Sequence, residues 1–329
     1  WELIRINKRK SVILMILMAV CLFFLGGLLG LLIAGPEWAW VGLAVAGIVW
    51  LVLAVLSFSA GDQILLSAAK AKRVDHDTFA QLFNVVEEMS LAASLPMPKV
   101  YLIADPAPNA FATGRKPERA SIAVTAGLVG KLNRDELQGV IAHEMSHILH
   151  RDILFITLAG VMLGSIVMMS HILLRSTFFS GGTSRRRYSS GGKGGGQGQL
   201  VLIIVAIVAA ILAPILAQIL YYSISRKREY LADAGAVRLT RYPTGLADAL
   251  AKISGDCSAQ LGSCNNINAP MFIVNPFKPK GAIKLSDLSS THPPISERIR
   301  ILRQMTRGAS YKDYSKSFTQ QTKSKTVIT

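Results

Sequence analysis

Two histidines and a glutamate lie close enough in the sequence to hold and use a metal ion. They belong to "HEMSH", residues 143–147. Side chains four residues apart share one face of an α-helix, so His143 and His147 can both reach a single zinc ion. Glu144 lies about 100° around the helix from His143, where its carboxylate reaches a water molecule at the metal instead of the metal itself. The spacing predicts a hydrolytic zinc site with Glu144 as general base, against the alternative of two surface histidines on a helix.

A zinc hydrolase of this kind needs a third protein ligand and one open coordination position. The candidates elsewhere in the chain are His150, His171, Glu229 and His292. His150 lies one turn too far along the helix to share a metal easily with His143, and we interpret it as a polar residue near a membrane surface. His171 lies inside an apolar run and is interpreted as a helix-packing residue.

Glu229 stands in "EYLADAGA", where Asp233 lies on the same helix face one turn later. A glutamate at the metal followed by this aspartate would supply a ligand and an acceptor for the ring N–H of a ligating histidine. Asp233 would then fix the orientation of that histidine. The alternative is an ordinary solvated acidic face, and the residues alone leave both interpretations open.

The segments around these residues predict a mainly α-helical domain with a small β-sheet. Residues 133–152 read as a helix with Asn133 as a possible N-cap, one side in the core and the histidine side facing a cleft. Residues 76–96 have the spacing of an amphipathic helix, whereas 99–104 and 119–129 are rich in strand formers. "APNAFATG" reads as a loop leading into a short extended piece, and residues 242–306 as further helix with loops.

Four apolar runs are long enough to cross a bilayer core of about 30 Å. They cover residues 12–35, 40–59, 153–174 and 200–222. We predict four transmembrane helices in two hairpins. Gly26 and Gly30 have the spacing of a helix-packing surface.

These runs set the predicted domain organisation. Residues 1–60 form an N-terminal transmembrane hairpin, and 61–151 the first part of a peptidase-type domain. Residues 152–222 form a second hairpin around a flexible Gly- and Arg-rich linker at 180–199. Residues 223–307 complete the domain, and 308–329 are predicted to be a disordered tail.

The net charge of +16 comes from Lys and Arg clustered beside the apolar runs. This pattern favours membrane flanks over nucleic-acid binding, which needs a basic stripe with interleaved aromatic residues. Counting these charges places the N-terminus, residues 61–151 and the 226–228 cluster in the cytoplasm, although Arg185, Arg186 and Arg187 disagree. The three cysteines fit no common zinc spacing and are expected to be unpaired thiols in a reducing compartment.

Four segments, taken together and in order, resemble the M48 family of membrane metallopeptidases, above all its bacterial heat-shock members. They are "NAFATG", "DELQGVIAHEMSHILHRD", "SRKREYLADAGAVRL" and "THPPISERI", and the resemblance runs from about residue 5 to 305. It implies an α+β, gluzincin-like metallopeptidase domain with one zinc ion per subunit. His143, His147 and Glu229 match the zinc ligands, and Glu144 matches the catalytic acid/base.

The family resemblance also implies a biological role. The chain would be an endopeptidase of the bacterial cytoplasmic membrane with its active site facing the cytosol. It would hydrolyse misfolded or damaged membrane proteins during stress, with the lipid bilayer as its other partner and no nucleic acid. Self-association and self-cleavage near residue 190 are further expectations.

Two further segments gain an expected role. Asn109, Ala110, Phe111 and Ala112 are expected to form an exposed strand edge beside the metal that pairs with the substrate backbone, although Asn109 suits a turn equally well. His292, held before two prolines, is a candidate for stabilising the oxyanion, with a structural loop histidine as the alternative.

Two alternative functions fit the sequence less well. A prenyl-protein endopeptidase of the same broad family would have more membrane spans enclosing a chamber, and four runs argue against it. A catalytically silent zinc-binding membrane scaffold or chaperone would need no general base, and Glu144 argues against that.

Overall fold

The structure is a computed structural model that describes residues 2–114, 116–180, 195–255, 293–305 and 310–322. The chain divides into two compact units. The sheet unit combines Trp1–Arg9, Ala60–Thr157 and Tyr222–Thr329, and the helical unit combines Lys10–Ser59 and Leu158–Tyr221. All described residues with predicted site chemistry belong to the sheet unit.

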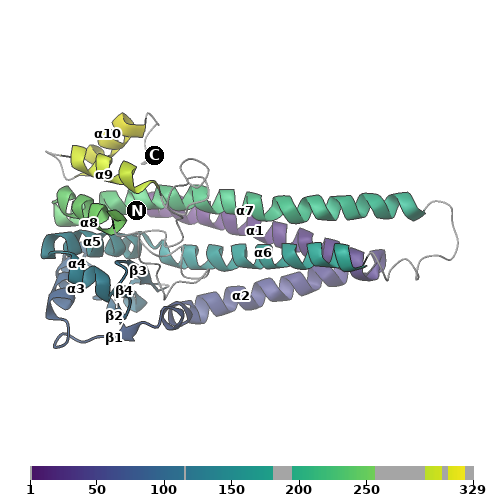
Figure 1. Ribbon diagram of the computed structural model, residues 1–329, viewed down its shortest axis with the longest axis horizontal. Helices are drawn as coiled ribbons and strands as arrows, with labels where there is room; N and C mark the ends of the chain where they lie inside the picture. The colour runs from purple at the N-terminus through teal and green to yellow at the C-terminus, as the bar shows by residue number, and fades with distance from the viewer. Residues whose placement is uncertain (1, 115, 181–194, 256–292, 306–309, 323–329) are drawn as a thin grey trace. The chain divides into compact units, whose positions relative to one another are not determined.

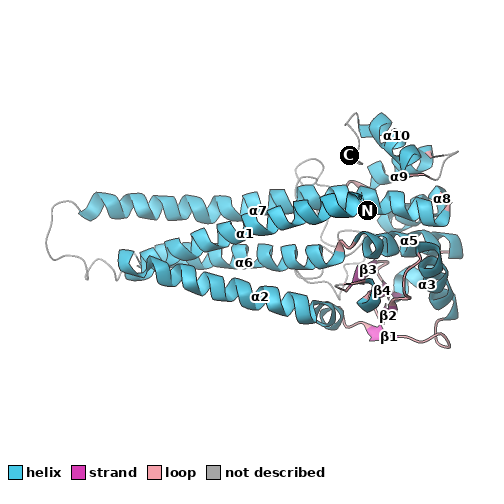
Figure 2. Ribbon diagram, turned by 180° about the vertical axis from the view of Figure 1, so that it is seen from behind, coloured by secondary structure: helices cyan, strands magenta, loops and turns pink. Residues whose placement is uncertain are grey.

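A four-stranded sheet has the order β1-β2-β4-β3 (Figure 2). Its strands are β1 (Lys72–Arg73), β2 (Lys99–Ile103), β3 (Ala110–Thr113) and β4 (Ser121–Thr125). β2 and β4 are parallel, while β1 and β3 pair antiparallel with them. Both predicted strands are present, and the extended piece in "APNAFATG" forms β3, which is an edge strand.

The helices of the sheet unit pack around a hydrophobic core, and a smaller separate cluster contains Ile103, Phe111 and Ala123 of the sheet. These helices are α3 (Ala80–Ala93), α4 (Ala126–Lys131), α5 (Arg134–His150), α8 (Pro243–Gly255), α9 (Ile295–Gln304), α10 (Tyr311–Thr322) and the end of α7 (Gly195–Thr240), with a 3-10 turn η2 (Pro117–Arg119). α5 packs against α3, α8 and β3 (Figure 1). It is therefore the central helix of this unit, and it carries the two histidines.

The start of α5 is fixed by a capping box, as the sequence predicts. The Asn133 side chain accepts a hydrogen bond from the Glu136 N–H at 2.9 Å, and the Glu136 carboxylate accepts one from the Asn133 N–H at 2.8 Å. The predicted apolar face of α5 lies in the core. The histidine side, predicted to face a cleft, is buried as well because side chains of α7 and α9 contact it.

The tail predicted to be disordered instead contains α10, so this prediction is wrong for residues 311–322. Tyr314 and Phe318 are buried in the core, and Phe318 packs edge-on against Tyr230 with ring centroids 4.8 Å apart. The Ser-, Thr-, Lys- and Gln-rich composition suggested disorder, but Tyr311, Tyr314 and Phe318 have the spacing of one helix face. Three aromatic residues on one face are enough to anchor a short helix to an existing core.

The helical unit contains most of α1 (Glu2–Ala34), α2 (Ala39–Ala68) and α6 (Ile153–Ser180) and the first part of α7, up to Tyr221. A 3-10 turn η1 (Pro36–Trp38) connects α1 and α2. Within the described residues, three stretches are long and apolar enough to span a membrane: Met15–Ile33, Pro36–Leu56 and Leu200–Gln218. Their outward side chains are exposed apolar residues such as Ile16, Trp40 and Leu200, which suits a lipid environment. The fourth predicted run forms α6 but is not among these stretches, and the side chains of residues 154–162 lie outside the described set.

Small residues bring α1 and α2 into close contact, as the spacing of Gly26 and Gly30 predicts. A Cβ atom added at Gly26 would meet Ala46 and Gly42, and one added at Gly30 would meet the backbone of Trp38 and Gly42. Side chains larger than hydrogen would therefore push the two helices apart. Such contacts between small residues are a common way to pack helices in membranes, where the hydrophobic effect does not drive association.

Candidate metal centre

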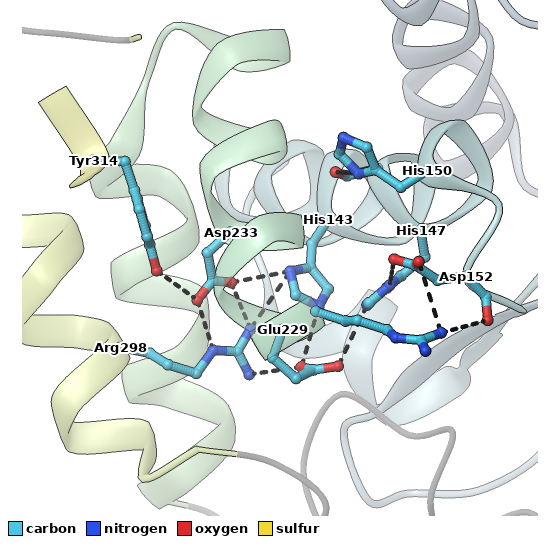
Figure 3. A network of polar contacts seen from close by, with 10 residues as sticks. His143, His147, His150, Asp152, Glu229, Asp233, Arg298 and Tyr314 are labelled. Carbon is cyan, nitrogen blue, oxygen red and sulfur yellow. Dashed lines mark hydrogen bonds and ion pairs between the residues drawn. The ribbon is translucent and has the colours of Figure 1, made fainter. Parts of the chain in front are cut away.

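Three side chains from two helices converge inside the sheet unit: His143 and His147 of α5 and Glu229 of α7 (Figure 3). One possible ligand atom from each lies within 4.8 Å of the others. The three residues are only 1%, 6% and 3% exposed. Although Glu229 follows a long hydrophobic insertion in the sequence, the fold brings it to the two histidines, as predicted.

The donor atoms are spaced widely enough for a metal ion to lie between them. His143 Nε2 lies 3.5 Å from Glu229 Oε2, and His147 Nε2 lies 3.4 Å from Glu229 Oε1. Both distances exceed an ordinary hydrogen bond of about 2.7–3.2 Å, and each histidine faces a different oxygen of the carboxylate. Two imidazoles and one carboxylate are also a donor set that catalytic zinc sites use, so the residues present fit this ion.

Asp233 contacts the other ring nitrogen of His143. Its Oδ1 lies 3.0 Å from His143 Nδ1, the contact that the one-turn spacing from Glu229 predicts. A proton on Nδ1 leaves the lone pair on Nε2, the nitrogen that faces Glu229. A carboxylate at this position would hold the imidazole in the tautomer and orientation that a metal requires.

Arg298 of α9 joins this network and is a residue that the sequence reasoning missed. It is fully buried, and its guanidinium donates to Asp233 through Nε at 2.9 Å and Nη2 at 2.7 Å. A third nitrogen, Nη1, lies 3.5 Å from Glu229 Oε2. The available signal was its position on the buried face of α9, since Arg298 shares that face with Ile301 and Leu302.

Asp233 is also influenced by the charge of Arg298 and contacted by a residue of α10. Burial raises the pKa of Asp233, but the positive charge of Arg298 outweighs this effect, and the net shift is downward. Tyr314 of α10 places its hydroxyl 3.5 Å from Asp233 Oδ2. The helix that was predicted to be a disordered tail thus reaches the metal-centre network.

Glu144 lies next to the edge strand β3. It is buried, and burial raises the pKa of its carboxyl group, while a hydrogen bond with the Ala112 backbone opposes the shift. A raised pKa brings a carboxyl group closer to neutral pH, where one group can both accept and return a proton. Glu144 therefore has the environment expected of an acid/base residue.

The predicted substrate strand is present as β3, but its side chains are buried and not exposed. Asn109 accepts a hydrogen bond from the Ala110 N–H at 3.1 Å and donates its own N–H to Thr125 Oγ1 at 2.8 Å. These contacts stabilise the turn into β3, which is the simpler of the two roles expected for Asn109. The backbone of Ala110–Ala112 keeps the edge position in the sheet.

The remaining histidine candidates lie apart from the metal group in the described structure. His150 is buried, with Nδ1 3.1 Å from Ser146 Oγ and Nε2 3.2 Å from the Tyr311 hydroxyl. Burial lowers its pKa, so it is a buried, neutral residue held by hydrogen bonds within the protein. His171 is exposed on α6 instead of packed against a neighbouring helix. His292 lies outside the described residues.

Among the described residues around the donor atoms, buried carboxylates outnumber buried arginines by two. The buried carboxylates of this region are Glu144, Asp152, Glu229 and Asp233. Arg228 and Arg298 offset two of them. One zinc ion would offset the other two, and so would one proton on each ligating histidine.

The pKa values of the histidines agree with this count. Burial lowers the pKa of His147, but contacts with Asp152 and Glu229 outweigh burial and raise the pKa to about 10. Burial also lowers the pKa of His143, whereas Asp233 and Glu229 raise it, and the net shift is upward. Before a cation binds, His147 is therefore expected to hold a proton at neutral pH.

Zinc affinity is accordingly expected to increase with pH between about 6.5 and 10, because zinc must displace the proton from His147. Displacement of this proton should give about a tenfold gain in affinity per pH unit. Without metal, the stability from the imidazolium contacts is complete below the ordinary histidine pKa of about 6.5 and is lost as pH approaches 10. Competition with a chromophoric chelator from about pH 6.5 to 8.5 tests the affinity, and calorimetry in buffers of different ionisation enthalpy counts the protons released. A flat pH profile with no proton release would contradict this expectation.

Comparison with known proteins extends these findings. Residues 76–306 match the family described as Peptidase family M48. The chain is similar to the "Protease HtpX homolog" of Dictyoglomus thermophilum, with 42% identity over 305 residues that cover 93% of this chain and 94% of the relative. The proteins of that name from Caldanaerobacter subterraneus and Listeria monocytogenes are each 40% identical, over 93% of this chain and 98% and 99% of the relatives. Among solved structures, S. mikatae Ste24p is similar at a TM-score of 0.49 and 19% identity, covering 92% of this chain and 66% of that one.

Proposed function

We propose a zinc-dependent mechanism for this chain, which belongs to peptidase family M48. It is a bacterial membrane metalloprotease: its curated relatives are named proteases, and three of its helices are apolar enough to span a bilayer. The observation that carries the proposal is the convergence of His143, His147 and Glu229. Glu144 lies next to His143 in α5. In this proposal the first three residues hold one zinc ion, and Asp233 orients His143.

When bound, zinc supplies Lewis acidity, which lowers the pKa of a water molecule toward neutrality and polarises the substrate carbonyl. Glu144 accepts the proton from the attacking water on its carboxylate. It then returns this proton to the amine nitrogen that leaves when the peptide bond breaks. Burial supports both steps because it raises the pKa of Glu144 from its ordinary value.

The substrate backbone would lie along β3. Ala112 contacts Glu144 through its backbone, so a peptide paired with Ala110–Ala112 would pass beside the acid/base residue. Recognition through main-chain hydrogen bonds places few demands on the substrate sequence, which suits a protease that acts on many proteins. His292 remains our candidate for a residue that stabilises the oxyanion.

The substrates that we propose are misfolded or damaged membrane proteins of the bacterial cytoplasmic membrane. The basic residues beside the apolar runs support a cytosolic orientation of the sheet unit. Glu229 follows the apolar stretch Leu200–Gln218 by only 11 residues in the sequence, which supports a metal centre close to the membrane surface. We also propose that α6 completes a fourth span. Self-cleavage in the linker at 180–199 is an accompanying proposal.

Zinc removal is the direct test of this function. The protein purified in detergent is expected to contain one zinc ion per chain and to cleave casein. A strong chelator should remove the zinc and reduce cleavage at least tenfold, and one equivalent of zinc should restore it. A protein that keeps zinc but never cleaves casein would support the catalytically silent scaffold instead. Cleavage that persists in the metal-free protein would overturn the zinc mechanism.

A further inference from the structure

We infer that Asp152 is a positioning residue for His147, and that its pairing with Arg228 joins the end of α5 to the helix that carries Glu229. The inference rests on the proposed function, because it takes His147 and Glu229 as ligands of one zinc ion. It assigns a second histidine–carboxylate–arginine chain beside that of His143, Asp233 and Arg298 (Figure 3).

The backbone at the end of α5 turns Asp152 toward His147. Arg151 adopts a left-handed conformation with φ 57° and ψ 38°, which ends the helix. The Asp152 N–H then donates to the His147 carbonyl at 3.1 Å, the hydrogen bond that is typical of this kind of helix end. The backbone hydrogen bond therefore holds Asp152 next to His147, which the Asp152 side chain also contacts.

The side chain of Asp152 lies at the nitrogen of His147 that faces away from the metal group. Asp152 Oδ2 lies 3.5 Å from His147 Nδ1, while His147 Nε2 lies 3.4 Å from Glu229. A proton on Nδ1 directed at this carboxylate leaves the Nε2 lone pair facing Glu229. This is the arrangement that Asp233 gives to His143, so each ligating histidine has one aspartate on its outer nitrogen.

Arg228 connects Asp152 to the other half of the site. Its Nη1 lies 3.8 Å from Asp152 Oδ1 and donates to the Asp152 carbonyl at 3.5 Å. Arg228 and Asp152 are only 2% and 1% exposed, so the charge of each is held away from water. Because Arg228 directly precedes Glu229, this pair ties the third ligand to the end of the helix that carries the first two.

Carboxylates that orient a ligating histidine commonly change metal affinity by 10–100-fold when they are replaced. Asp152→Asn keeps the size of the side chain and removes its charge. In the full-length protein, this variant is expected to release zinc to a chromophoric chelator 10–100-fold faster than the wild type. With cobalt in place of zinc, its visible absorption bands should shift, because the geometry at His147 changes. Asp105→Asn is a matched control, since Asp105 is also a buried aspartate and accepts a hydrogen bond from the Ala107 N–H at 2.9 Å.

A double variant separates metal positioning from simple charge balance. Asp152→Asn alone leaves Arg228 buried beside a neutral partner and could lose stability for that reason. Asp152→Asn combined with Arg228→Met removes both charges, so the metal-free double variant should unfold close to the wild-type temperature. It should still release zinc 10–100-fold faster. A double variant that holds zinc like the wild type, or one that does not fold at all, would overturn the inference, because Asp152 would then serve only folding.

The same measurements distinguish this inference from the proposed function. If the wild type binds no zinc, or if His143→Ala leaves zinc binding unchanged, the proposed function fails. If the wild type binds one zinc ion that His143→Ala removes, and Asp152→Asn releases zinc at the wild-type rate with unchanged cobalt bands, only the role of Asp152 fails.

Discussion

The Glu144→Gln variant is expected to bind zinc normally and to lose peptide hydrolysis. Glutamine has nearly the shape of glutamate, and its amide oxygen can still accept the hydrogen bond from the Ala112 backbone. An amide, however, cannot accept the proton of the attacking water or return it to the leaving amine. General acid–base catalysis of this kind contributes about 10²–10⁴-fold to the rate, so casein cleavage should decrease by at least that factor while zinc content stays at one per chain.

A glutamate elsewhere in α5 provides the control for this experiment. Glu136 is also buried, but it caps the start of the helix and lies 2.8 Å from Lys252 Nζ. Glu136→Gln should lower the unfolding temperature and leave the turnover of folded protein close to that of the wild type. If Glu144→Gln cleaves casein at the wild-type rate, with contaminating protease excluded, another group must be the base.

The parts of the site that follow from spacing within one helix could be predicted from the sequence. The four-residue interval between His143 and His147 and that between Glu229 and Asp233 fix which side chains share a face. The predicted contact between Asp233 and a histidine of the site is present, with Asp233 Oδ1 3.0 Å from His143 Nδ1. The cap at Asn133 is equally local, and it too is where the sequence indicated.

The parts that depend on contacts between distant segments could not be predicted in this way. Composition suggested that the C-terminal tail is disordered, but α10 exists because Tyr314 and Phe318 find a core made by other segments. Likewise, the spacing in "ISERI" puts Arg298 on an apolar helix face without saying which carboxylate it meets. A charged residue on an otherwise apolar face indicates a buried ion pair, and its partner is known only once the fold is known.

Arg298→Met is expected to produce the largest loss of stability among the changes considered for this site. Arg298 makes two hydrogen bonds to Asp233, and both residues are fully buried. Methionine fills part of the same space but leaves Asp233 as a buried carboxylate without its guanidinium partner. Breaking a buried pair by removing one partner costs about 3–5 kcal/mol. Thermal and denaturant unfolding of the detergent-purified protein, both without metal and with zinc, measures this loss.

Arg303 provides a matched control in the same helix. It pairs with Asp248 at 3.2 Å, but the two side chains are 57% and 49% exposed. An exposed pair of this kind contributes about 0–1 kcal/mol, so Arg303→Met should change the unfolding temperature little. Equal losses of stability in the two variants would contradict the account of the site, since they would mean that Asp233 is not held as a buried anion.

Arg298→Met should also weaken zinc binding beyond its effect on folding. The positive charge of Arg298 lowers the pKa of His143. Its removal would therefore favour a proton on His143, and that proton competes with zinc for the imidazole. Arg298→Lys restores one positive charge but not the two parallel hydrogen bonds, so its stability and zinc affinity should fall between those of Arg298→Met and the wild type. If Arg298→Lys were as damaging as Arg298→Met, the shape of the guanidinium would matter more than its charge.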